Sequence, residues 1–95
     1  MNTANLNIPP ENRETRLKRL TMRSMRRGIK EMDILLMRYA EARLAQMDDA
    51  QLDVYEALLH ENDQDLYQWV SGQVAPPARF ATLIDDIRAV AAHGP

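Results

Sequence analysis

The sequence predicts an all-α protein, a compact five-helix bundle that forms a single domain. Apolar residues recur at spacings of three and four along most of the chain, which is the pattern of helices with one buried face. No segment shows the sustained alternation and β-branched enrichment that strands favour. The 95 residues, 45% apolar and 27% charged, suffice for one core but leave little room for a deep catalytic cavity.

A first helix is expected over about residues 11–27, after a flexible tail at residues 1–10. Apolar residues are few in this stretch, and Leu17, Leu20 and Met25 define only a narrow seam. We therefore expect this helix to be partly buried, with arginines spread over the rest of its surface.

Gly28 separates the first helix from a second one, expected over residues 29–46. Because glycine has no Cβ, it can take the left-handed backbone angles that end a helix. The second helix contains no glycine or proline and has a broad apolar stripe, so we expect it to be the central element of the bundle. The stripe consists of Ile29, Met32, Leu35, Leu36, Tyr39, Ala40, Arg43 and Leu44.

A third helix begins at a well-formed capping sequence. Asp48 can cap it, Gln51 can reach back to the cap, and Met47 can pack on Leu52 as a hydrophobic staple.

Two further helices complete the bundle. The fourth is expected to begin at Asn62 or Asp63 and to end at Gly72, and the fifth to have Pro77 in its first turn and a frayed end at residues 93–95. The last three helices are predicted to bury Leu52, Tyr55, Leu58, Leu59, Leu66, Trp69, Val70, Phe80, Leu83, Ile84, Ile87 and Val90.

Catalysis has little support in the sequence. Cysteine is absent and only two histidines are present, which argues against thiolate chemistry and a histidine-based metal site. There is no glycine-rich phosphate loop, no dinucleotide-binding signature and no Ser/His/Asp arrangement. We therefore expect no independent enzyme activity and no tightly bound cofactor.

The composition also bears on location. No run approaches the roughly 20 apolar residues of a membrane span, and residues 1–10 have neither the basic nor the apolar region of a signal peptide. These features predict a soluble protein of a reducing compartment, most simply the bacterial cytoplasm.

Charge is distributed unevenly along the chain. Residues 1–30 carry eight Lys/Arg and two Glu, giving +6, whereas residues 31–95 carry four Arg and twelve Asp/Glu, giving −8. Such a basic arm on an acidic body can serve nucleic-acid binding, an acidic protein partner, or attraction between two faces of one molecule. A small nucleic-acid-binding or regulatory adaptor that uses the basic first helix is therefore the alternative function. An overall pI near 5.6 and the lack of aromatic residues in that helix speak against it.

The stretch from Arg23 to Asp33 is the main candidate for a functional site. It carries more charge around one bare backbone position than a helix end requires. Glycine permits a partner's backbone to approach closely, while the flanking cations can donate to partner oxygens and the acids can accept. The candidate partner-binding residues are Arg23, Arg26, Arg27, Gly28, Lys30, Glu31 and Asp33.

These residues resemble the signature of a known family. Arg27-Gly28-Ile29-Lys30-Glu31 is similar to the RGxxE motif of the SdhE-type flavinylation factors, small five-helix proteins that assemble succinate dehydrogenase. A second block, Leu58-Leu59 followed by Asp63, Asp65-Leu66 and Trp69, resembles the leucine pair and D-x-D-L-x-x-W pattern of that family. The resemblance covers about residues 13–90.

The resemblance implies a chaperone for the flavoprotein subunit of succinate dehydrogenase, with fumarate reductase as a second candidate client. Such a factor promotes covalent attachment of FAD to the client rather than catalysing the reaction. The resemblance transfers the signature role to Arg27, Gly28 and Glu31. We expect a monomer that binds no nucleic acid and inserts into no membrane, and we expect Arg27→Ala to leave the melting temperature nearly unchanged.

Overall fold

The computed structural model describes residues 11–25 and 27–93, apart from the side chain of His93. The expectations for residues 1–10, Arg26 and residues 94–95 lie outside this part of the chain. The described helices are α1 (Arg13–Ser24), α2 (Lys30–Arg43), the short 3-10 helix η2 (Leu44–Gln46), α3 (Asp49–Leu59), α4 (Asp63–Ser71), the 3-10 helix η3 (Ala78–Phe80) and α5 (Ala81–His93). The described chain contains no strand, which confirms the predicted all-α bundle of five α-helices.

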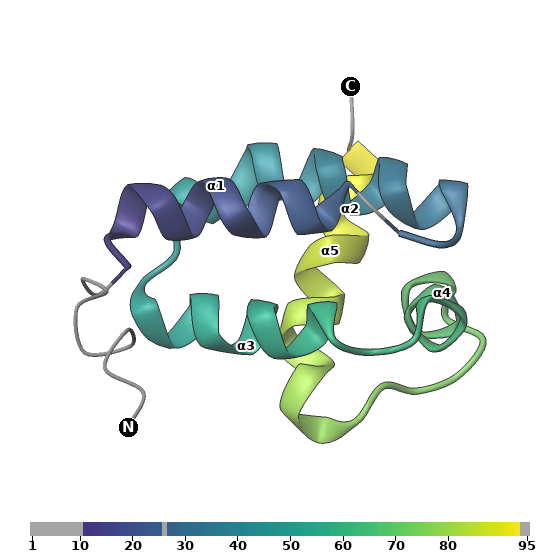
Figure 1. Ribbon diagram of the computed structural model, residues 1–95. Helices are drawn as coiled ribbons and strands as arrows, with labels where there is room; N and C mark the ends of the chain where they lie inside the picture. Colours follow the sequence, from purple (N-terminus) through teal and green to yellow (C-terminus); the bar gives the residue numbers. More distant parts are fainter. Residues whose placement is uncertain (1–10, 26, 94–95) are drawn as a thin grey trace, which may run out of the picture.

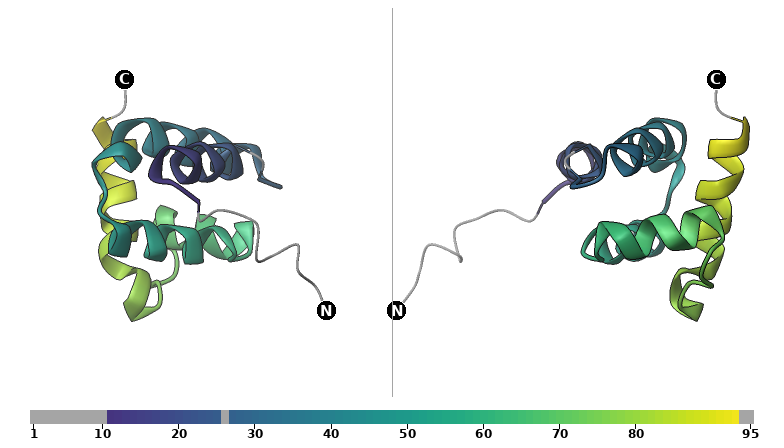
Figure 2. Two further views of the ribbon diagram at one scale, coloured as in Figure 1. Left: turned by 60° about the vertical axis from the view of Figure 1, so that its left-hand side comes forward. Right: turned by 90° about the vertical axis from the view of Figure 1, so that its right-hand side faces the viewer.

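The helices form two layers closed at one side. Helices α1 and α2 lie side by side, α3 and α4 lie in a second layer, and α5 runs across both layers (Figures 1 and 2). Helix α2 packs against α1, α4 and α5, which confirms its prediction as the central element.

The core is built from the stripes predicted for α2 to α5. Tyr39 of α2 and Tyr55 of α3 are almost fully buried, with ring centroids 5.7 Å apart. Trp69 and Phe80 form a second aromatic pair at 5.9 Å. Other core side chains are Leu20, Met32, Leu36, Leu44, Leu52, Leu58, Leu66, Ile84 and Ile87.

The local start and stop signals are confirmed for α3 and α4. Asp48 and Gln51 form the predicted capping box of α3. Asn62 caps α4 through the backbone N–H of Gln64, and Gly72 ends that helix in the left-handed conformation with φ 86°. Pro77 does not lie in the first turn of α5 as predicted, because its backbone is extended (ψ 149°) and η3 separates it from α5, which begins at Ala81.

Two predictions about the first helix are wrong. Helix α1 ends at Ser24 rather than near residue 27, and Met25 is exposed instead of extending the buried seam. Gly28 does not take left-handed angles, since Gly72 is the positive-φ glycine of the described chain. Ser24, the last residue of α1, is buried in the core and hydrogen-bonds Tyr55. The chain leaves the helix directly after Ser24, so α1 ends earlier than the sequence predicts.

Candidate partner-binding site

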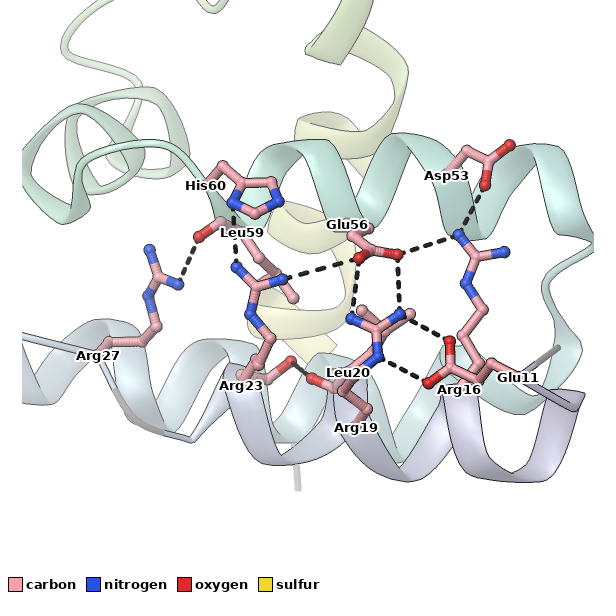
Figure 3. A network of polar contacts seen from close by, with 11 residues as sticks. Glu11, Arg16, Arg19, Leu20, Arg23, Arg27, Asp53, Glu56, Leu59 and His60 are labelled. Atoms are coloured by element: carbon pink, nitrogen blue, oxygen red, sulfur yellow. Dashed lines mark hydrogen bonds and ion pairs between the residues drawn. The ribbon is translucent and has the colours of Figure 1, made fainter. Parts of the chain in front are cut away.

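The connection between α1 and α2 is held by the side chain of Arg27. Its Nη1 donates to the carbonyl of Leu59 at 2.8 Å, and its Nη2 donates to the carbonyl of Glu61 at 3.0 Å. Its Nε donates to Oδ1 of Asp63 at 2.6 Å. The Arg27 side chain is only 9% exposed and reaches across to the end of α3, where Figure 3 shows its bond to Leu59. Arg27 therefore binds its own chain with all three guanidinium nitrogens.

The backbone of the connection is held by two carboxylates. The N–H of Arg27 donates to Asp33 in the first turn of α2, and the N–H of Gly28 donates to Oδ2 of Asp63. A Cβ at Gly28 would lie 3.1 Å from that same oxygen, which is tighter than ordinary contact. Glycine is thus suited to this position by the close approach of Asp63, and not by a left-handed turn.

Three of the residues that follow face solvent. Gly28, Lys30 and Glu31 are exposed, whereas Ile29 between them is partly buried and packs against the core. Glu31 makes no ion pair with any described residue, and Arg27, four positions earlier, is paired with Asp63. The predicted site therefore divides into two parts. Arg27 and Asp33 face inward and fix the connection between α1 and α2, residues 27–31, which we call the corner. Gly28, Lys30 and Glu31 are its exposed residues.

Asp63 is the residue of this site that sequence reasoning missed. It was assigned only to the start of α4, although it belongs to the second block that resembles the family pattern. That block was the available signal, because the structure joins it to the RGxxE signature through the Arg27–Asp63 pair. The two motifs therefore contact each other in the folded protein.

Arg23 lies in a different environment from the rest of the predicted site. It points toward α3, where Nη2 is 3.3 Å from Nδ1 of His60 and Nη1 is 3.9 Å from Glu56. It is part of a charged network between α1 and α3 (Figure 3). Arg26, the remaining predicted residue, lies outside the described chain.

The network centres on Glu56. Arg19 donates to Glu56 at 2.8 Å and Arg16 at 3.2 Å, while the two arginines also pair with Glu11 at 2.8 Å and Asp53 at 2.6 Å respectively. Hydrogen bonding from Arg19 lowers the pKa of the Glu56 carboxyl, and Arg16 adds to this effect. Much of the basic charge of α1 is therefore neutralised by the molecule's own acidic body, one of the three alternatives that the charge distribution left open.

A pocket lies away from this corner, between α2, α3 and α5. It has a volume of about 670 Å³ and is lined by residues that include Tyr39, Met47, Val54, Leu83 and Asp86. The Tyr39 hydroxyl donates to Asp86 at 2.7 Å, and burial raises the pKa of that hydroxyl. The described residues contain no cluster of three or more potential metal ligands, and no helix among them is long and apolar enough to cross a membrane.

The described chain is a small helical bundle with exposed charged residues at the corner, which an arginine and two aspartates hold from inside. The chain belongs to the family described as the flavinator of succinate dehydrogenase, whose model matches residues 18–91. This finding confirms the family resemblance drawn from the signature.

Curated relatives agree with the family match. The chain is similar to the mitochondrial succinate dehydrogenase assembly factor 2 of Meyerozyma guilliermondii, with 48% identity over 61 residues that cover 64% of this chain and 45% of the relative. It is also similar to the proteins of that name from Mycosarcoma maydis, with 39% identity covering 75% and 30%, and from Kluyveromyces lactis, with 39% identity covering 73% and 45%. The chain thus spans less than half the length of each of these relatives.

The relatives overturn the expectation about origin and location. They are fungal proteins named as mitochondrial, so the bacterial and cytoplasmic assignments made from the sequence are wrong. Those assignments rested on the composition of the first ten residues and on the lack of an apolar run, and neither feature reports on a compartment.

Proposed function

We propose that this protein is an assembly chaperone for the flavoprotein subunit of succinate dehydrogenase and promotes covalent attachment of FAD to that subunit. The family match supports the client, and one structural observation supports the mode of action: Gly28, Lys30 and Glu31 are exposed, while the connection from which they follow is fixed by Arg27. A rigid, charged corner of this kind can dock on a folded partner with little loss of conformational entropy.

The chemistry of attachment belongs to the client and its flavin. The factor acts by favouring the client conformation in which the flavin ring and the receiving side chain are aligned, which is a proximity contribution rather than acid–base catalysis. It therefore acts as a chaperone, not as an enzyme, and requires no tightly bound flavin of its own. We propose that it works as a monomer and that fumarate reductase is a further client. Because it leaves once assembly is complete, its interface is polar and transient.

The alternative function, nucleic-acid binding through the basic first helix, is disfavoured by the contacts of that helix. Arg16 and Arg19 are engaged by acids of the same chain, and Nη2 of Arg13 donates to the carbonyls of Ala45 and Met47. Phosphate binding would have to break these interactions before gaining its own.

A reconstitution tests the proposal. Purified flavoprotein subunit lacking covalent flavin is incubated with FAD, with or without the factor, and covalent flavin is read by in-gel fluorescence. The factor should accelerate attachment, and Glu31→Gln should reduce the acceleration about tenfold, as expected for loss of one charge-assisted contact. Glu41→Gln is the matched control, since Glu41 is an exposed glutamate of the same helix outside the corner. Equal activity of both variants would remove Glu31 from the site, and no acceleration by the unaltered protein would contradict the proposed function.

A further inference from the structure

The side chain of Asp63 contacts the corner and does not cap its own helix. It is the first residue of α4, where an acidic side chain is favoured by the helix dipole. In this helix Asn62 is the cap, accepting from the N–H of Gln64 at 2.8 Å. The carboxylate of Asp63 is therefore available for other partners.

Those partners are two consecutive residues of the signature. Oδ1 of Asp63 accepts from Nε of Arg27 at 2.6 Å, and Oδ2 accepts from the backbone N–H of Gly28. The Asp63 side chain is 15% exposed, so both interactions are largely shielded from water. One carboxylate thus holds a side chain and a backbone group that lie 36 and 35 positions away in the sequence.

The backbone of the corner is held here by side chains rather than by helical hydrogen bonds. Residues 27 and 28 belong to no helix, and their N–H groups are bonded by the side chains of Asp33 and Asp63. Without the carboxylate of Asp63, the Gly28 N–H loses its acceptor and the Arg27 guanidinium loses its only ion-pair partner among the described residues. Arg27 would keep its bonds to the carbonyls of Leu59 and Glu61, but the backbone at Gly28, which leads into the first turn of α2, would be less firmly held.

We propose that Asp63 is a positioning residue for client docking: it touches no client atom but holds the segment from Gly28 to Glu31 in its binding-competent conformation. This inference rests on the proposed function and deepens it. It assigns the second sequence block a role in recognition, since a residue of α4 controls the geometry of a surface that begins before α2.

The test measures client affinity for Asp63→Asn, together with amide hydrogen exchange at Gly28. A neutral amide offers one oxygen acceptor where the carboxylate offers two, so the two interactions can no longer be made together. The dissociation constant should rise about tenfold, because only a fraction of the variant would hold the docking conformation at any time. The Gly28 amide should exchange faster than in the unaltered protein.

The control is Asp49→Asn. Asp49 is also the first residue of its helix and follows a capping residue, but its only ion pair in the described chain is a 3.9 Å contact with Arg13 at the far end of α1. Its substitution should leave the dissociation constant within about twofold, since exposed pairs of this kind contribute little. A matched loss of affinity in both variants would point to a general charge effect and overturn the assignment.

A merely structural role of Asp63 predicts a different outcome. If the variant is partly unfolded, the apparent dissociation constant should rise only by the reciprocal of the folded fraction, which circular dichroism measures at the assay temperature. A rise no larger than this, or unchanged affinity despite faster Gly28 exchange, overturns the proposal. Lack of any client binding by the unaltered protein would instead contradict the proposed function, and this inference with it.

Discussion

Arg27 and Glu31 stand four positions apart in one signature, but the structure gives them opposite roles. Arg27 turns inward and makes three interactions with its own chain, whereas Glu31 is exposed. If every residue of the signature were assumed to contact a partner, Arg27 and Glu31 would be given the same role. The structure instead shows that Arg27 fixes the corner from inside, whereas Glu31 is exposed on its surface.

This difference revises one expectation about Arg27. A purely partner-binding arginine could be replaced without loss of stability, but the contacts of Arg27 predict that Arg27→Ala lowers the free energy of unfolding by about 3 kcal/mol, because it leaves a largely buried carboxylate without its cation. Urea denaturation measures the change. Arg38→Ala serves as control, since Arg38 is exposed on α2, and it should cost less than about 0.5 kcal/mol. Equal costs would show that the Arg27 contacts do not stabilise the fold.

Among the elements, the local signals of α3 and α4 were read correctly, whereas features set by distant contacts were missed. The capping box at Asp48 and the left-handed Gly72 were predictable because each depends on residues within one helical turn. The Arg27–Asp63 pair spans 36 positions and leaves no periodic trace, so only the structure could join them. The end of α1 was misplaced for a similar reason, because its position depends on Ser24 meeting Tyr55 in the core.

Helix α1 is attached to the body largely by charge. Its fully buried residues are Leu20 and Ser24, while the network around Glu56 connects it to α3. This arrangement makes the attachment sensitive to pH. Because the pKa of Glu56 is lower in the folded protein than its ordinary value of 4.5, the folded state binds fewer protons than the unfolded chain as the solution is acidified.

The free energy of unfolding should therefore hold above about pH 4.5 and fall as the pH drops toward the lowered pKa of Glu56. Glu56→Gln should be about 1 kcal/mol less stable at pH 7 and should show a flatter decline in acid. Denaturation at a series of pH values measures both effects, with Glu14→Gln, an exposed position of α1, as control. Parallel pH curves for the two variants would mean that Glu56 does not contribute this dependence.

In the whole molecule, much of the positive charge of α1 is paired with acidic residues of α3. The basic first helix lies along the acidic third helix, where Arg16, Arg19 and Arg23 face Glu56 (Figure 3). The fold class, the central helix and the core were predictable from apolar spacing alone. The division of the signature into inward and outward residues was not, because spacing in sequence does not say which side chains a distant helix will engage.

Hydrogen–deuterium exchange tests whether the exposed corner after Gly28 is the docking surface. It compares the protein with and without the flavoprotein subunit and is read by mass spectrometry. Protection on binding should therefore concentrate in residues 27–34, while residues 79–89 beside the pocket remain unchanged. Protection confined to residues 13–23 of the basic helix, or to the pocket, with no change at residues 27–34, would contradict the account.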